Sequence, residues 1–155
     1  MRIGACQPPE ILGDVDAAVR SIQGFCGQGE REGVDLLLFP ECFLQGYLPT
    51  EAHVRRHALD LGSARFRSVA ARLADVTPVL VIGVIERLGS RLFNSAVVLD
   101  HGQVAGPTGR HISLPGSPSS VTGANTRSSM CGGLRYGVNI CYDTRFADAA
   151  ARIAS

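Results

Sequence analysis

The sequence contains no lysine, and all fifteen of its basic side chains are arginines. The arginines are scattered along the chain, and the formal net charge is only +1. Nucleic-acid binding usually depends on the strong positive field of clustered basic residues. The charge pattern therefore excludes a nucleic-acid partner.

Long apolar runs are also missing, since none approaches the ~20 residues that a membrane helix needs. The start of the chain, with Pro8 and Pro9 close behind Met1, does not look like a signal peptide. The five cysteines are odd in number and lack C-x-x-C spacing, which argues against a disulfide framework and a zinc ribbon. We expect a soluble cytoplasmic protein with no membrane partner and no metal or other cofactor.

The composition that is present suits one folded domain. The chain has 155 residues, of which 45% are hydrophobic and 19% charged. We see no internal repeat and no linker, so residues 1–155 are expected to form a single domain.

Apolar residues at three- and four-residue spacing predict two amphipathic helices. The first begins after Asp14, which can cap a helix, and ends before Gly33. Its apolar stripe consists of Val15, Ala18, Val19, Ile22, Phe25 and Cys26. The stripe of the second helix consists of Phe66, Val69, Ala70 and Leu73. The alanine-rich residues 147–153 predict a further helix.

Short apolar runs predict strands between and after these helices. They cover residues 2–7, 35–39, 78–85, 92–99 and 135–140, with 103–105 as a short return strand. The run 35–39 is expected to be buried on both faces of a sheet. Residues 106–126, rich in Gly, Pro, Ser and Thr, predict a loop. Strands that alternate with helices indicate a layered α/β architecture.

Cys141 lies where a predicted strand gives way to a predicted helix. Unpaired N–H groups at a helix start favour a thiolate and can hold an oxyanion, so this position suits a nucleophile. The alternative is a buried thiol that only packs, as free cysteines commonly do.

Glu41 follows directly on the apolar run that ends at Phe39 and Pro40. A carboxylate partly withdrawn from water at the end of a buried strand suits proton transfer, so Glu41 is a candidate general base. The alternative is an exposed loop carboxylate. Cys42 is expected to point away from whatever Glu41 faces, and to pack.

The histidines offer no metal site. His53, His57 and His101 stand among polar residues and are expected to be solvated. His53 and His57 have i,i+4 spacing, but the segment lacks the glutamate of a zinc-protease helix and any third ligand.

Six stretches resemble the nitrilase superfamily of carbon–nitrogen hydrolases, in the order expected for that family. They are Gln7-Pro8, Leu38–Glu41, Gly46-Tyr47, Gly83 with Glu86, Asn94–Asp100 with Gly102, and Gly137–Asp143 with Arg145-Phe146. The resemblance covers nearly the whole chain, and the combination of FPE, NSAVVLD and ICYDxRF is specific.

The resemblance implies an αββα sandwich and a Glu–Lys–Cys triad that acts on amides, nitriles or carbamoyl groups. Glu41 falls on the family's base and Cys141 on its nucleophile, which forms a thioester acyl-enzyme. The backbone N–H of Tyr142 falls on an oxyanion donor. A small-molecule amide or nitrile substrate and a homo-oligomer are implied in the same way.

The family's lysine has no match in this sequence. It normally stands in a Tyr-Arg-Lys-x-His-Leu-Pro segment, and the matching stretch is Gly109–Pro115. Alignment on Leu-Pro puts His111 in its place, and a one-residue gap puts Arg110 there. Arginine does not give up a proton near neutral pH, and histidine is mostly uncharged there. We therefore expect weak or absent activity for the isolated chain.

The family's domain continues well past its nucleophile, whereas residues 142–155 are all that follow here. The sandwich is therefore expected to be incomplete, with its C-terminal part missing and with sheet edges and an apolar face that favour association. Two functions remain open. The chain is a carbon–nitrogen hydrolase, or it is a catalytically inactive homologue that acts as a binding or scaffold protein.

Overall fold

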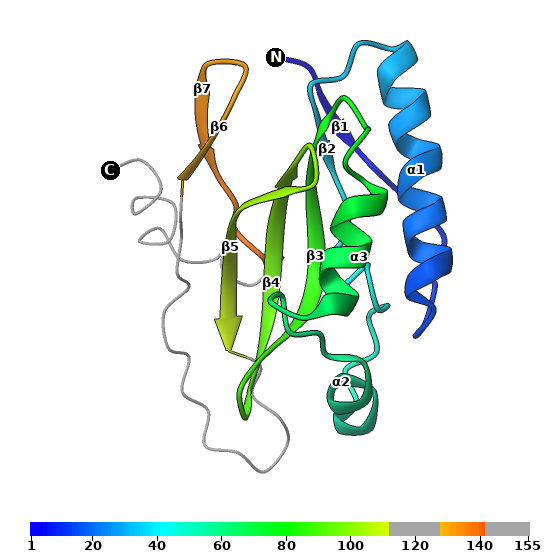
Figure 1. Cartoon of the computed structure of the whole chain (residues 1–155), viewed down its shortest axis with the longest axis vertical. Helices are drawn as coiled ribbons and strands as arrows, with labels where there is room; N and C mark the ends of the chain where they lie inside the picture. Colours follow the sequence, from blue (N-terminus) through cyan, green and yellow to red (C-terminus); the bar gives the residue numbers. More distant parts are fainter. Residues whose placement is uncertain (112–127, 142–155) are drawn as a thin grey trace.

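A five-stranded sheet with helices on one face forms the body of the computed structural model, which describes residues 1–111 and 128–141 (Figure 1). The sheet order is β1 (Ile3–Ala5), β2 (Leu36–Leu38), β3 (Val79–Leu88), β4 (Arg91–Asp100) and β5 (Gln103–His111). The helices are α1 (Val15–Arg31), α2 (Glu51–His57) and α3 (Ala64–Arg72). A separate hairpin consists of β6 (Ser128–Cys131) and β7 (Leu134–Gly137).

The sheet is mixed. Strands β1, β2 and β3 run parallel, with Leu36 in register between Ile3 and Val79. Strands β3, β4 and β5 run antiparallel, and β3 turns into β4 through the two residues between Leu88 and Arg91. Because β2 and β3 are parallel, the turn that follows β2 lies beside the middle of β3, between Val81 and Ile85. This arrangement positions Glu41.

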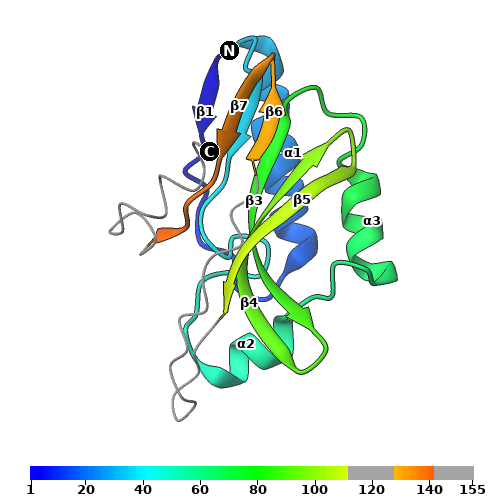
Figure 2. The same cartoon turned by 90° about the vertical axis from the view of Figure 1, so that its left-hand side faces the viewer.

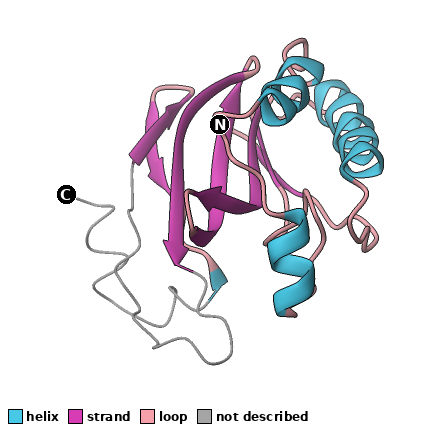
Figure 3. Ribbon diagram, turned by 60° about the horizontal axis from the view of Figure 1, so that its bottom comes forward, coloured by secondary structure: helices cyan, strands magenta, loops and turns pink. Residues whose placement is uncertain are grey.

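Helices α1 and α3 cover one face of the sheet (Figures 1 and 3). The Asp14 side chain accepts a hydrogen bond from Ala17 N over 2.9 Å and so caps α1, as predicted. The predicted apolar stripes of both helices pack against the sheet, with Phe25 only half-buried. Burial of these stripes is the main source of helix stability, since short isolated helices are marginal in water.

The opposite face of the sheet carries a second, smaller core. It consists of Leu36, Val79, Val81, Ala96 and Val98 with Cys131 and Ile140. The hairpin β6–β7 lies on this face (Figure 2). The expectation that residues 35–39 are buried on both faces is right for Leu36, Leu37 and Phe39 but wrong for Asp35, which is exposed, and for Leu38. The side chain of Leu38 is 40% exposed and lines the cavity described below.

Two further expectations are corrected by the structure, and one helix was not predicted. Residues 106–111 continue β5 and are not a loop, because β4 extends far enough to pair with them. The last strand ends at Gly137, short of residue 140, and pairs with β6 in a hairpin. The turn between β6 and β7 has positive φ at Gly132 (54°) and Gly133 (77°), a conformation that glycine adopts without strain. Helix α2, capped by the Thr50 side chain, was not predicted. The expected helix at 147–153 lies outside the described residues.

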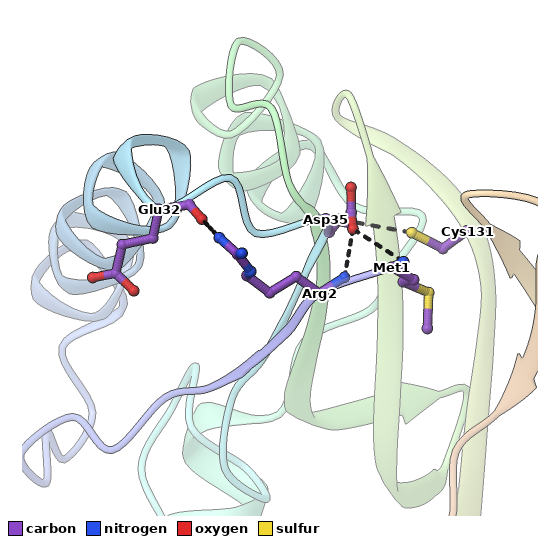
Figure 4. A network of polar contacts seen from close by, with 5 residues as sticks. All are labelled: Met1, Arg2, Glu32, Asp35 and Cys131. Carbon is purple, nitrogen blue, oxygen red and sulfur yellow. Dashed lines mark hydrogen bonds and ion pairs between the residues drawn. The ribbon is translucent and has the colours of Figure 1, made fainter.

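A polar network at the start of β2 joins the hairpin to the sheet (Figure 4). The Asp35 carboxylate accepts a 2.5 Å hydrogen bond from Arg2 N and lies 3.8 Å from Met1 N. The Arg2 guanidinium donates to the Glu32 carbonyl at the end of α1. From the hairpin, the Cys131 thiol donates to the Asp35 carbonyl over 3.7 Å. These contacts anchor the hairpin that leads to Cys141.

Within the described residues, no helix has the length and apolarity needed to cross a membrane.

Candidate active site

A cavity of about 270 Å³ opens where the turn after β2 meets the segment after β7. Its lining includes Leu38, Glu41, Gly83, Asn94, Asn139 and Cys141. The structure therefore brings Glu41 and Cys141, which are far apart in the sequence, to the walls of one cavity.

The turn that carries Glu41 is fixed to β3 by backbone hydrogen bonds on either side of it. Phe39 N donates to the Val81 carbonyl over 2.9 Å, and Leu44 N donates to the Gly83 carbonyl over 3.0 Å. The backbone of Glu41 is thereby held between two bonds to one strand.

Gln45 adds a third attachment two residues further along β3. Its side chain donates to the Ile85 carbonyl over 3.0 Å and accepts from Ile85 N over 2.9 Å. The side chain is fully buried, so these bonds satisfy polar groups that have no access to water. This role could not be predicted, because a glutamine beside a turn is typical of a surface residue.

Cys141 is an exposed residue with a left-handed backbone conformation, φ 48°. In the described part of the chain, the other non-glycine residues with positive φ are Cys42 and His101. Such strain persists only where the surroundings enforce it, and it is frequent at active sites. The preceding residue, Ile140, is 6% exposed and is anchored in the second core. The segment that follows β7 thus brings Cys141 to the wall of the cavity.

Asn94, in the middle of β4, joins the two residues of the Glu41 turn. Its side-chain N–H donates to Glu41 Oε1, and its Oδ1 accepts from the Cys42 thiol over 3.6 Å. The expectation that Cys42 packs is right, since it is 5% exposed. The expectation that it points away from the surroundings of Glu41 is wrong. The segment is a turn with φ 53° at Cys42, so strand alternation does not apply.

Asn94 is not among the predicted site residues, although its position in the sequence carries a signal. Asparagine is disfavoured in strands, and burial of its amide is costly without partners. A lone asparagine within the apolar run 92–99 therefore indicates a buried side chain with hydrogen-bond partners.

Both candidates for the place of the missing lysine lie at the end of β5. The backbone register pairs Arg110 with Asn94 and His111 with Phe93. Arg110 is thus the strand partner of the residue that contacts Glu41. Tyr142, the expected oxyanion donor, lies outside the described residues.

The expectation of solvated histidines fails at His53, which is 8% exposed and lies with Nε2 3.1 Å from the Gly46 carbonyl oxygen. The unpredicted helix α2 causes this burial. The ring of His57 lies 4.6 Å from that of His53. Burial lowers the pKa of His57, with smaller contributions from His53, Arg56 and Arg65.

His101 is exposed, as expected. Among the residues that the structure describes, no group of three or more His, Cys, Asp or Glu side chains could hold a metal ion.

The thiols differ in a way that predicts selective alkylation. Burial raises the pKa of Cys6 to about 11 and that of Cys26 to about 12, and it also raises the pKa of Cys131. The thiolate is the reactive form, and Cys141 is the exposed cysteine. We expect iodoacetamide at pH 8 to modify Cys141 in the native protein and all five cysteines after unfolding in urea. Peptide mass spectrometry reads out each site.

The matched control is Cys141→Ser, which should leave the native protein unmodified on the same timescale. Faster modification of Cys26 than of Cys141 would contradict the burial found here.

Comparison with known proteins identifies the family. The profile of the carbon–nitrogen hydrolase family matches residues 2–155. The chain belongs to the carbon–nitrogen hydrolase family. This confirms the resemblance found in the sequence.

Curated relatives include the glutamine-dependent NAD(+) synthetase of Mycobacterium bovis, 31% identical over 106 residues. That match covers 68% of this chain and 16% of the relative. The enzyme of the same name from Thermotoga maritima is 27% identical over 149 residues, covering 92% of this chain and 26% of the relative. The carbon–nitrogen hydrolase chain therefore spans about a quarter or less of these proteins.

Solved structures agree on the fold. A glutamine-dependent NAD+ synthetase from Acinetobacter baumannii superposes with a TM-score of 0.78 at 24% identity, covering 98% of this chain and 30% of that chain. An amidase from Nesterenkonia sp. superposes with a TM-score of 0.70 at 21% identity, covering 96% and 58%. The predicted α/β fold of the nitrilase type is confirmed.

Proposed function

We propose that this chain hydrolyses the carbon–nitrogen bond of a small-molecule amide, with Cys141 as nucleophile and Glu41 as general base. The observation that carries the proposal is that both residues line one cavity of about 270 Å³. A volume of this order suits a small ligand better than a peptide or polymer. Family membership supports the class of bond that is cleaved.

In the proposed reaction Glu41 takes the proton of the Cys141 thiol, and the sulfur attacks the amide carbon. The tetrahedral intermediate collapses when the C–N bond breaks, and Glu41 returns the proton to the leaving nitrogen. Water then attacks the thioester, and Glu41 accepts a proton from it. Cleavage of the C–S bond releases the carboxylic acid, and Glu41 returns the proton to the departing sulfur, which regenerates the thiol and the free base.

The oxyanion of both intermediates needs positive partners. We propose the Tyr142 backbone N–H as one of them, on the strength of the family resemblance. For the other, the strand register favours Arg110 over His111, because Arg110 is paired with Asn94. A fixed positive charge at Arg110 would stabilise the oxyanion but would not exchange protons.

Glutamine is the proposed first substrate. The curated relatives are described as glutamine-dependent, and one of the similar structures is an amidase. Glutamine carries a primary amide whose hydrolysis releases ammonia. Because the chain spans only part of those relatives, the proposal is limited to amide hydrolysis. A cytoplasmic location and a homo-oligomer stay predictions from the sequence.

Ammonia release from L-glutamine tests the proposal. We expect slow release by the 155-residue chain, abolished in Cys141→Ala, with a coupled glutamate dehydrogenase assay as the readout. An acyl adduct on Cys141 in intact-mass spectra would establish the covalent step. Ammonia release that persists in Cys141→Ala would refute the assignment of the nucleophile.

The absence of lysine favours one alternative, a catalytically inactive homologue that binds a ligand or partner. It predicts glutamine binding by calorimetry with neither ammonia nor an acyl adduct. The same two experiments therefore separate the candidates.

A further inference from the structure

We infer that Asn94 is a positioning residue for Glu41. Cys42 fixes the orientation of the Asn94 side-chain amide in which its N–H faces Glu41. The inference rests on the proposed function, in which Glu41 is the base. It assigns a role to Cys42, a residue that takes no part in the chemistry.

The chemistry of the contacts decides which way the Asn94 amide points. An ionised carboxylate only accepts hydrogen bonds, so the amide N–H must face Glu41. That leaves Oδ1 on the side of Cys42, whose thiol can donate. A flipped amide would place its oxygen against the carboxylate and its N–H group against a weakly accepting sulfur. Both neighbours therefore favour the same orientation.

Burial makes this orientation energetically important. Asn94 is 6% exposed and stands on a strand whose next residues on the same face, Ala96 and Val98, are apolar. A buried amide group without a hydrogen-bond partner destabilises the folded state, because it has given up its bonds to water. The two side-chain contacts compensate that cost, which accounts for a polar residue at this position.

The backbone conformation of Cys42 also supports a role for its thiol. Its φ of 53° is disfavoured for a residue with a Cβ, and glycine would adopt it freely. A glycine at this position would relieve the strain but would remove the donor to Asn94. The chain thus keeps a strained cysteine where its thiol reaches the amide.

The consequence for Glu41 is one of orientation. The bond from Asn94 to Oε1 fixes the rotation of the carboxylate in the cavity wall. Loss of Asn94 should therefore impair the base without touching Cys141.

The experiment compares alkylation of Cys141 by iodoacetamide across pH 6–9 in the wild type and in Glu41→Gln, Asn94→Ala, Asn94→Asp, Cys42→Ala and Cys42→Ser. Peptide mass spectrometry follows the peptide that contains Cys141. We expect Glu41→Gln and Asn94→Ala each to slow alkylation at pH 7 about tenfold. In Asn94→Asp the profile should move to higher pH, because two adjacent carboxylates share a proton.

The Cys42 pair separates positioning from packing. Cys42→Ser keeps a donor and should stay within about twofold of the wild type, whereas Cys42→Ala should slow alkylation about threefold. If Asn94→Ala does not fold, the pH profile of the isosteric Asn94→Asp and the Cys42 pair decide the question.

The outcomes distinguish the two proposals. If Glu41→Gln leaves alkylation unchanged, Glu41 is not the base, and the role of Asn94 falls with it. If Glu41→Gln slows alkylation while folded Asn94 variants keep the wild-type rate and profile, the inference about Asn94 alone is wrong.

Discussion

Replacing Gly83 with alanine is expected to destabilise the protein and to displace Glu41. A Cβ at this position would lie 2.2 Å from the Pro40 carbonyl oxygen, 2.4 Å from Cys42 N and 2.8 Å from Glu41 C. All three are backbone atoms, so no side-chain rotation can relieve the clash. Gly83 also accepts the hydrogen bond from Leu44 that closes the turn. Overpacking of this kind costs ~1–3 kcal/mol, and here the cost falls on the backbone that carries the base.

Urea unfolding with a second readout at the site checks this prediction. We expect a lower unfolding midpoint, with slower alkylation of Cys141 in the fraction that stays folded. The matched control is Gly24→Ala, at an exposed position of α1 where a Cβ would meet nothing within 4 Å. That change should raise the free energy of unfolding by ~0.5–1 kcal/mol, because alanine favours helix. Equal behaviour of the two variants would show that β3 and the Glu41 turn are not in close contact.

Regular burial made much of this fold predictable. Apolar residues recur at three- and four-residue spacing from Val15 to Cys26 and from Phe66 to Leu73, because each helix buries a single face. The strands after residue 78 could be assigned for a related reason, since β3 and β4 are buried along most of their length. Local context made Glu41 and Cys141 candidates, because each follows an apolar run. Their assignment as base and nucleophile came from the resemblance to the nitrilase superfamily.

The contacts between distant segments could not be predicted in the same way. Nothing near Gln45 in the sequence indicates that its side chain pairs with Ile85. The positive φ of Cys42 likewise depends on the close approach of the Glu41 turn to Gly83. Strand β5 was mistaken for a loop beyond Ala105 because its Gly, Pro and Thr residues have low strand propensity, and pairing with β4 overrides that preference.

Restoring the lysine is expected to raise activity, and by different amounts at the two candidate positions. Arg110→Lys should increase ammonia release from glutamine about a hundredfold, while His111→Lys should leave it nearly unchanged. Lysine offers a charge to the oxyanion and can also exchange a proton when its surroundings lower its pKa, which arginine cannot do. The strand register favours position 110, because Arg110 is paired with Asn94 and Asn94 contacts Glu41.

The control for each lysine variant is the same substitution combined with Cys141→Ala. Any gain in ammonia release that depends on the proposed nucleophile must vanish in this double variant. An increase with His111→Lys and none with Arg110→Lys would favour the alignment on Leu-Pro over the strand register. If neither variant gains activity, the missing lysine is not what limits the chain, and the inactive-homologue alternative becomes the better account. A gain confined to Arg110→Lys would instead show that the Glu41 and Cys141 turns are already correctly placed. One cationic side chain would then separate this chain from an efficient amidase.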